Sequence, residues 1–437
     1  MSATFRSFAV PNYRLWFAGA LVSNVGTWMQ RTAQDWIVLT QLTQGDAVAV
    51  GVTMSLQLGP QLLLVPWSGY VADRFYRRKL LMTTQAVMGM LGIGLGIISV
   101  TGVAQLWMVY VFALALGIAS AFDAPARQAF VSELVPPPLL PNAVSLNSAS
   151  FNGARLIGPA VAGVLTAVVG AGPVFLINGG SFAATLLALL LLRTSALEKQ
   201  SRPPRGPGQL REGLRYVRSR PDIVLILVTI FVIGTFGMNF PIYAATMASQ
   251  VFHHDASGFG LVSSVIAIGS VTGALLAARR ERPRMAVLFA ACGAFGATVI
   301  VAAFMPAYVA FAAVLVLVGF TAITIMTTAN GIVQSTTAPE MRGRVMALYM
   351  AVFMGGTPIG SPIIGALSNA FGPRWAMAVG GFSGFVALGI GVAYWMVKGG
   401  RVRVDRSRRI PLAIYYASSP RQAETDLALD ETVARVS

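Results

Sequence analysis

The sequence predicts an all-α membrane protein with twelve transmembrane helices in two six-helix pseudo-repeats. Three observations lead to this fold class: twelve long apolar stretches, the placement of positive charge between them, and a partial repeat of the first half in the second. Hydrophobic residues make up 55% of the 437 residues and charged residues 11%. Ordinary soluble domains contain about 25% charged residues.

Each apolar stretch is long enough to cross a bilayer as a helix, which takes about 20 residues at a rise of about 1.5 Å per residue. A helix also satisfies its own backbone hydrogen bonds inside lipid. The spans are expected at 15–42, 47–72, 80–101, 104–124, 142–169, 172–192, 223–250, 257–278, 285–305, 307–332, 345–371 and 374–397.

Positive charge lies in alternate gaps between these spans. If the first span starts in the cytosol, 29 of the 32 Lys and Arg residues fall on the cytosolic side, Arg374 falls on the far side, and Arg31 and Arg155 lie within spans. Cytosolic loops of membrane proteins carry such an excess. We therefore expect a multi-pass protein of the bacterial inner (plasma) membrane with both termini in the cytosol. Nucleic-acid binding is not expected, because it needs basic residues gathered on one folded surface.

The rare chemical residues do not form a catalytic or metal-binding pattern. The single cysteine, Cys292, lies inside an apolar span, and the two histidines, His253 and His254, share one short loop. The chain lacks a Walker A sequence for ATP. No enzymatic activity, metal or cofactor is therefore expected.

The chain is expected to divide into two helical halves with a linker between them. The segment after Thr194 is rich in Arg, Pro and Gly, which suits a cytosolic connector. Within it, Leu214 and Val217 follow a helical spacing with arginines beside them, which predicts a short amphipathic helix on anionic lipid at the cytosolic face. The expected domains are 1–193 (N-terminal half), 194–222 (linker with the amphipathic helix), 223–398 (C-terminal half) and 399–437 (flexible cytosolic tail).

The two halves share short sequence matches at nearly the same offset. Ala143-Val-Ser-Leu opens the fifth span and Val345-Met-Ala-Leu opens the eleventh, and Pro159 corresponds to Pro362. Repeated halves are a common plan of secondary transporters, with the substrate site at the interface of the repeats.

Three motifs resemble those of a known family. Gly69-Tyr-Val-Ala-Asp73-Arg-Phe-Tyr-Arg-Arg-Lys79 resembles the loop signature of the major facilitator superfamily, with Tyr76 where the family usually has glycine. Gly158-Pro-Ala-Val-Ala-Gly163 resembles an element of the superfamily's antiporters, and Arg342-Gly-Arg344 also fits. The resemblance covers residues 5–397 and is closest to the drug–proton antiporter branch that includes the enterobactin exporter. It implies a transporter that works by alternating access; a monomer is expected, although the sequence leaves the oligomeric state open.

The loop signature suggests a latch on the cytosolic side. Asp73 can face the positive end of the eleventh helix or Arg127, because a helix N-terminus attracts a carboxylate. The resemblance implies that such contacts hold the halves together when the pocket opens outward. A plain positive-inside anchor explains the basic residues equally well, but not Asp73. The expected latch residues are Gly69, Asp73, Arg74, Arg77, Arg78, Asp123 and Arg127.

Spans five and eleven are rich in proline and glycine. Proline removes a backbone donor, and glycine allows close approach between helices. Two interpretations stay open: hinges for alternating access, or helix packing alone. The candidate hinge residues are Gly158, Pro159, Gly163, Pro358, Gly360 and Pro362.

The sharpest chemical feature is a polar face in span one. Asn24, Arg31 and Asp35 share one helical face. Charges inside a bilayer are costly and usually face a cavity or a partner. Asp35 is either a protonation switch, at which proton uptake and substrate binding compete, or one member of a static pair with Arg31. Arg155 in span five is a second candidate partner for Asp35.

The resemblance implies that spans one, four, seven and ten line the substrate cavity. Aromatic and methionine surfaces with a few amides suit bulky amphipathic compounds. The expected function is secondary active export of drug-like amphipathic organic compounds in exchange for protons. A dedicated siderophore or metabolite exporter, or a non-transporting membrane receptor, are the alternatives. The candidate cavity residues are Trp28, Tyr110, Asn239, Tyr243 and Asn330.

Overall fold

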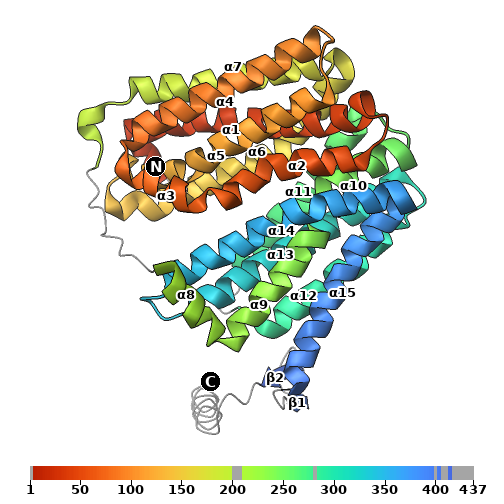
Figure 1. Ribbon diagram of the computed structural model, residues 1–437. Helices are drawn as coiled ribbons and strands as arrows, with labels where there is room; N and C mark the ends of the chain where they lie inside the picture. The colour runs from red at the N-terminus through yellow and green to blue at the C-terminus, as the bar shows by residue number, and fades with distance from the viewer. Residues whose placement is uncertain (1–2, 199–208, 279–282, 398–400, 405–411, 416–437) are drawn as a thin grey trace.

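The computed structural model describes residues 3–198, 209–278, 283–397, 401–404 and 412–415. Figure 1 shows two groups of helices, one from each half of the chain, joined through a short linker helix. The N-terminal half comprises α1 (Pro11–Ile37), α2 (Ala47–Leu63), α3 (Val65–Arg74), α4 (Arg77–Val100), α5 (Leu106–Leu134), α6 (Leu140–Val169) and α7 (Ala171–Leu191).

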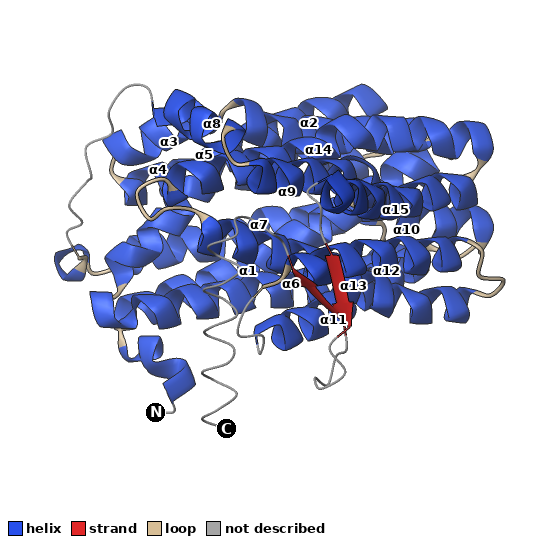
Figure 2. Ribbon diagram, turned by 90° about the horizontal axis from the view of Figure 1, so that it is seen from below, coloured by secondary structure: helices blue, strands red, loops and turns tan. Residues whose placement is uncertain are grey.

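The C-terminal half follows the linker helix α8 (Gln209–Arg218). It comprises α9 (Pro221–Val232), α10 (Phe240–Thr246), α11 (Ala256–Ala278), α12 (Met285–Ala303), α13 (Tyr308–Thr336), α14 (Arg342–Phe371) and α15 (Pro373–Val397). A two-stranded antiparallel hairpin, β1 (Arg401–Val404) with β2 (Leu412–Tyr415), lies in the tail, where we expected no fixed structure. Figure 2 shows this hairpin as the one strand element beside the helices of the described chain; residues 405–411 and 416–437 of the tail lie outside the described residues.

Each of the twelve predicted spans corresponds to one helix or to one broken helix. Among the described residues, ten helical segments are long and apolar enough to cross a membrane. The remaining two spans are α1, whose polar face carries Arg31 and Asp35, and α2, which is shorter and continues into α3. The predicted fold class, a twelve-helix membrane protein in two six-helix halves, is confirmed.

Two spans are broken where the sequence weakens the helix. Span two is interrupted at Leu64, which follows Pro60 and precedes Pro66, because each proline removes a backbone donor. Span seven runs from α9 through a π-helical turn at Ile233–Gly237 to α10 and a second π-helical turn at Met247–Val251. Such π-helical turns are frequent at functional sites.

The two halves touch mainly along two helix crossings, α2 with α14 and α6 with α11, with smaller contacts of α10 with α1 and α2 and of α11 with α1. The backbones approach so closely that a Cβ atom on Gly51 would lie 2.3 Å from the carbonyl oxygen of Ser361. A Cβ on Gly260 would likewise lie 2.4 Å from the carbonyl oxygen of Pro159. Small residues allow this approach between membrane helices.

Hydrogen bonds reinforce the contact at the end of the bundle that carries the α1–α2 loop. Asn369 Nδ2 donates to Asp46 Oδ1 over 2.6 Å, and the Ala47 amide donates to Asn369 Oδ1 over 2.9 Å. Gln250 Nε2 donates to the Gly45 carbonyl over 2.8 Å. We call these cross-half contacts the seal. At the other end α3 and α8 lie apart (Figure 1), so the halves meet at the seal and diverge toward the end that carries the linker.

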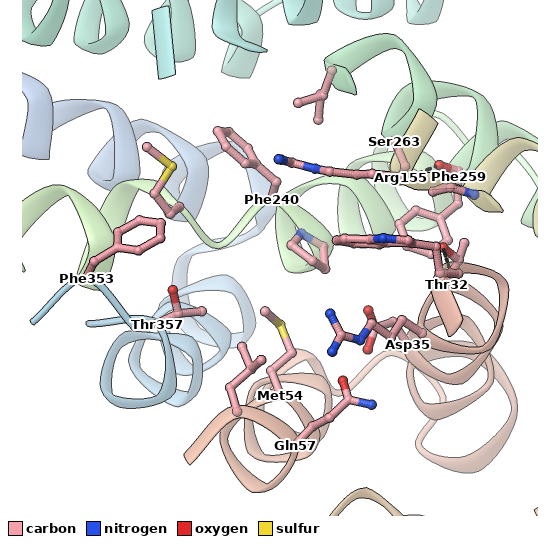
Figure 3. Close-up of a pocket in the computed structure, with 17 residues that line it drawn as sticks. Thr32, Asp35, Met54, Gln57, Arg155, Phe240, Phe259, Ser263, Phe353 and Thr357 are labelled. Atoms are coloured by element: carbon pink, nitrogen blue, oxygen red, sulfur yellow. Dashed lines mark hydrogen bonds between the residues drawn. The ribbon is translucent and has the colours of Figure 1, made fainter. Parts of the chain in front are cut away.

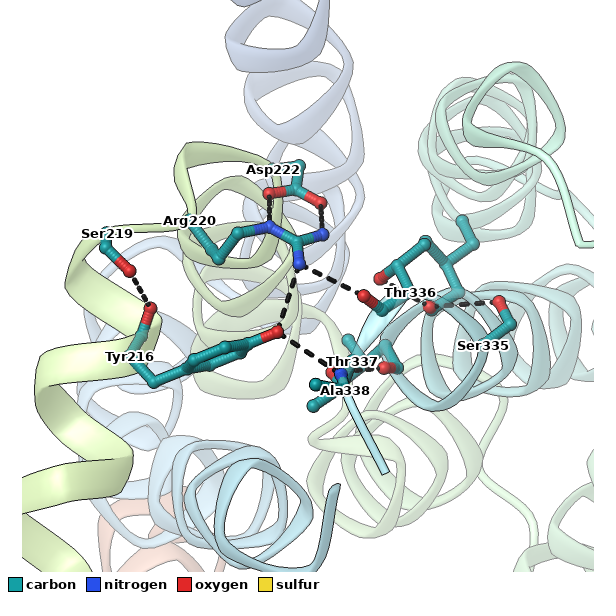
Figure 4. Close-up of polar contacts among 10 residues, drawn as sticks. Tyr216, Ser219, Arg220, Asp222, Ser335, Thr336, Thr337 and Ala338 are labelled. Atoms are coloured by element: carbon teal, nitrogen blue, oxygen red, sulfur yellow. Dashed lines mark hydrogen bonds and ion pairs between the residues drawn. The ribbon is translucent and has the colours of Figure 1, made fainter. Parts of the chain in front are cut away.

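The linker helix α8 is fixed to the C-terminal half. Glu212 forms an ion pair of 2.9 Å with Arg344 at the start of α14. Arg220 binds both carboxylate oxygens of Asp222, at 2.9 and 2.6 Å, and donates to the Thr336 carbonyl at 3.0 Å. Tyr216 Oη accepts hydrogen bonds from Arg220 and from the Ala338 amide (Figure 4). Arg211, Arg215 and Arg218 remain exposed on α8.

Candidate functional site

A cavity of about 270 Å³ lies between the two halves, on the inner side of the seal. Its N-terminal wall comes from α1, α2 and α6, and its C-terminal wall from the α9–α10 segment, α11 and α14. Figure 3 shows Asp35 and Gln57 on one wall, with Phe240 and Phe353 across the cavity. The apolar lining includes Met54, Met238, Phe240, Phe259, Ile266 and Phe353.

Asp35 is the one carboxylate among the residues that line this cavity. Asp35 is 7% exposed. Within the described part of the chain it has neither a hydrogen bond nor an ion pair within 4.0 Å, and Arg31, one turn earlier on α1, does not pair with it directly. Nε of Arg31 is buried and has no hydrogen-bond partner among the described residues. This geometry does not favour the interpretation of Arg31 and Asp35 as a tight static pair.

Arg31 and Arg155 instead share an aromatic neighbour. Their guanidinium carbons lie over the ring of Trp28, at 5.3 and 5.8 Å from its centroid. Gly158, one turn after Arg155, makes this possible, because a Cβ there would lie 2.6 Å from the Trp28 Cβ. A larger residue would push α6 away from α1. The glycine therefore helps to place Arg155 beside the Trp28 ring, at the cavity wall.

The structure brings together four of the polar or aromatic residues predicted for the site. Trp28, Arg31, Asp35 and Arg155 all line the cavity. Asn24, two turns before Arg31, is not among its lining residues. Gln57, Ser263 and Thr357 line it and were not predicted, because their helices (α2, α11 and α14) were not expected at the cavity.

Four predicted cavity residues lie elsewhere. Tyr110, Asn239, Tyr243 and Asn330 are not among the residues that line this cavity. Asn239 and Tyr243 are buried and donate to the carbonyls of Thr235 and Phe236, so they stabilise the broken span seven. Asn330 accepts a hydrogen bond of 2.6 Å from Gln334 on its own helix.

The walls of the cavity also differ from the expected set of spans. α5 and α13, which form spans four and ten, do not contribute to this cavity. The four helices that cross between the halves (α2, α6, α11 and α14) supply the lining side chains in their place. The cavity thus combines spans one and seven (α1 and the α9–α10 segment), which were expected, with α2, α6, α11 and α14.

The expected latch residues make contacts within the N-terminal half. Asp123 accepts hydrogen bonds from Thr84 and Gln85, each at 2.8 Å, and forms an ion pair of 2.9 Å with Arg127 on the same helix. Figure 1 shows that α5, which carries both charges, lies inside the N-terminal group of helices. Asp123 is 5% exposed, so this is a buried polar cluster.

The basic residues near α3 follow the same pattern. Arg77 forms an ion pair of 2.6 Å with Glu133, and Arg78 donates to the Leu189 carbonyl over 2.7 Å. Arg74 donates to the hydroxyl of Tyr70, within α3, the helix that also holds Gly69. The Asp73 side chain lies outside the described residues. Because the halves diverge at this end, the described latch residues contact neighbours in their own half.

The candidate hinge residues lie at close helix contacts. α6 runs unbroken through Gly158, Pro159 and Gly163, and α14 through Pro358, Gly360 and Pro362. A Cβ on Gly163 would lie 2.6 Å from the Ala256 carbonyl oxygen, and Ser55 donates to the Pro358 carbonyl over 2.6 Å. In this conformation these residues pack helices against each other; bending remains a prediction.

Two six-helix halves around a central cavity define a membrane transporter of the major facilitator type. The family model described as transmembrane secretion effector matches residues 2–412. The chain therefore belongs to this family of the major facilitator superfamily. This confirms the family predicted from the motifs of α3 and α6.

Transporters of several kinds are similar to this chain along most of their length. The staphyloferrin A transporter of Staphylococcus aureus is 25% identical, over 85% of this chain and 93% of its own. The multidrug efflux pump Tap of Mycolicibacterium fortuitum is 24% identical, over 81% and 88%. The enterobactin exporter EntS of Salmonella choleraesuis is 26% identical, over 87% and 91%.

A solved structure shares the fold. A bacterial homologue of the human lysosomal transporter Spinster, in an inward-facing and occupied conformation, superposes with a TM-score of 0.69. It covers 90% of this chain and 97% of its own, at 15% sequence identity. At this identity the match shows the fold alone.

Proposed function

We propose that this protein is a secondary active transporter that exports amphipathic organic compounds in exchange for protons by alternating access. The observation that carries the proposal is the carboxylate of Asp35, which lines the cavity between the two halves and has no hydrogen bond or ion pair among the described residues. Buried carboxylates inside membrane spans commonly mark proton or substrate pathways. The multidrug efflux pump and the enterobactin exporter among the relatives support the direction of transport, and together with the staphyloferrin A transporter they support an organic substrate.

The proposed exchange follows from competition for one carboxylate. When Asp35 is ionised, it accepts a cationic or hydrogen-bond-donating group of the compound. When Asp35 binds a proton, it loses its charge, and the attraction for that group falls. The substrate then binds to the Asp35 carboxylate from one side of the membrane, and a proton binds to the same carboxylate from the other side, in alternation. If the seal opens and α3 approaches α8, the cavity closes at the end near the linker and opens at the end that carries the seal. The site is then accessible from the opposite side of the membrane.

The placement of positive charge supports an orientation with both termini in the cytosol of a bacterial inner membrane. In that orientation the seal faces outward, and the end where the halves diverge faces the cytosol. Substrate then enters from the cytosol, as export requires. When the cavity opens outward, we expect Asp73 and its neighbours to contact the C-terminal half as a latch, and Gly158 and Gly360 to allow the bending of α6 and α14.

The test uses purified protein in liposomes with an acidic interior. A panel of lipophilic cations and siderophores is added outside, and substrate uptake and internal pH are followed together. Exchange predicts uptake that raises the internal pH and that a protonophore abolishes. Uptake without a pH change contradicts proton coupling, and binding without uptake of any compound favours the receptor alternative.

A dedicated siderophore exporter is the second candidate. Relatives that handle staphyloferrin A and enterobactin, aligned over most of both chains, favour it. The same panel separates the two candidates, because a dedicated exporter moves one compound class with high affinity and a multidrug exporter moves several.

A further inference from the structure

The charges of the side chains that line the cavity do not sum to zero. Arg31 and Arg155 contribute two positive charges, and Asp35 contributes the one negative charge among the lining residues. Within the described chain, neither arginine has an ion pair within 4.0 Å. An ionised cavity therefore keeps one uncompensated positive charge in a low-dielectric interior, where charges are usually paired.

Trp28 orients the two guanidinium groups without neutralising them. Their carbon atoms lie 5.3 and 5.8 Å from the centroid of its ring. A cation over an aromatic ring is stabilised, but less than by a carboxylate in direct contact. Nε of Arg31 is also buried, and no described residue provides an acceptor for it. Donors converge here from two helices, α1 and α6, and the residues that line the cavity do not supply their acceptor.

We propose that Arg31 and Arg155, held beside Trp28, form a subsite for an acid group of the exported compound. The inference rests on the proposed function and narrows its substrate class. The guanidinium fork matches a carboxylate through two parallel hydrogen bonds. The compound thus carries an acid group here, a cationic or hydrogen-bond-donating group at Asp35, and an apolar body.

The apolar body has a defined place. Met238, Phe240 and Phe353 line the wall contributed by the C-terminal half, and Figure 3 shows Arg155 extending into the cavity toward Phe240. A cavity of about 270 Å³ lies just below the range of about 300–1,000 Å³ for drug-sized ligands. It therefore holds a compact aromatic amino acid, or the acidic end of a larger amphipathic compound.

The alternative is a structural role, in which the arginines and Trp28 only hold α1 against α6. That role predicts variants with altered stability and an unaltered preference for charge. The two roles are separated by four probes that share a naphthalene body: naphthylalanine, naphthylacetic acid, naphthylmethylamine and naphthylmethanol. Binding is measured by calorimetry on the full-length protein in detergent, where neither flux nor a gradient is needed, so a failure of proton coupling leaves this test unaffected.

We expect naphthylacetic acid to bind about tenfold more tightly than naphthylmethylamine and naphthylmethanol, with naphthylalanine the tightest. Arg155→Gln should remove the advantage of the two acids and leave the affinity for naphthylmethanol within about twofold. Arg155→Lys, which keeps the charge without the fork, should retain part of it. Arg211→Gln is the matched control, because it removes the same charge from the exposed face of α8.

Three results overturn the proposal. The first is an amine that binds as tightly as the acid, and the second is the absence of binding of either acid at millimolar concentration. The third is an acid preference in Arg155→Gln equal to that in Arg211→Gln, with both variants folded by size-exclusion chromatography. A variant that fails to fold is replaced in the comparison by Arg155→Lys, whose reduced acid preference then carries the test.

Discussion

Removal of the Asn369 side chain should weaken the seal and shift the protein toward the opposite conformation. Asn369→Ala deletes two hydrogen bonds between the halves, one to the Asp46 carboxylate and one from the Ala47 amide. A hydrogen bond between neutral groups contributes about 0.5–1.5 kcal/mol net and one to a charged group about 1.5–3 kcal/mol, but Asn369 is exposed, so water competes for both bonds and lowers their contributions. A total of about 1 kcal/mol corresponds to a shift of about fivefold in the conformational equilibrium.

The shift can be measured as a distance across the end where the halves diverge. Spin labels on Tyr76, after α3, and on Arg211, on α8, occupy exposed positions in opposite halves. The buried Cys292 is replaced by alanine so that only these two sites are labelled. Double electron–electron resonance should show a larger short-distance population in Asn369→Ala than in the parent.

The matched control is Asn152→Ala. Asn152 is also exposed, but it donates only to the Ser148 carbonyl of its own helix α6. Equal distance distributions for Asn369→Ala, Asn152→Ala and the parent would refute the assignment of these hydrogen bonds as a seal.

Three further predictions concern other elements. Gly260→Leu should destabilise the α6–α11 crossing by about 1–3 kcal/mol and enlarge the same short-distance population, whereas Gly153→Leu, with no atom within 4 Å of its Cβ position, should not. Asp123→Ala leaves Arg127 buried without its partner, so thermal unfolding in detergent should reveal a loss of about 3 kcal/mol or more, and an unchanged midpoint would contradict the buried cluster. Asp255 caps α11: the Ser257 hydroxyl and the amides of Ser257 and Gly258 lower its pKa below the ordinary value. The cap therefore stabilises the folded state above the ordinary pKa and is lost as pH falls through the lowered one. The protection factors of the amides in the first turn of α11, which are corrected for the intrinsic exchange rate at each pH, should fall on acidification in the wild type but not in Asp255→Ala.

The positions of the helices could be predicted from the sequence because the apolar stretches that form them are local features. Span boundaries such as 257–278 and 345–371 agree closely with α11 and α14, since apolar length and flanking charges mark them. The largest difference is α5, which continues ten residues beyond the expected end, to Leu134. Its last turns carry Arg127 and Glu133, which form ion pairs with Asp123 and Arg77 inside the N-terminal half.

The cavity was less predictable because it depends on which helices meet. Asp35 and Arg31 could be found, since charges inside a span are rare and costly. Gln57 and Thr357 could not, because nothing local distinguishes a polar side chain at a cavity from one between helices. Asn239 shows the converse: its amide is used to stabilise the broken helix beside it. The contact of Arg155 with Trp28 depends on the close approach of α6 to α1, and Gly158 is the only local sequence feature that indicates this approach.

The most direct measurement of the central claim compares two modes of transport by Asp35→Asn in liposomes. Substrate-for-substrate counterflow needs binding and alternating access only, whereas uptake driven by an acidic interior also needs the proton site. If Asp35 couples substrate transport to proton transport, the variant retains counterflow of a transported compound. It loses pH-driven uptake together with the accompanying rise in internal pH. A variant that retains pH-driven uptake and the same pH change as the wild type would contradict the account and leave Asp35 as a structural residue.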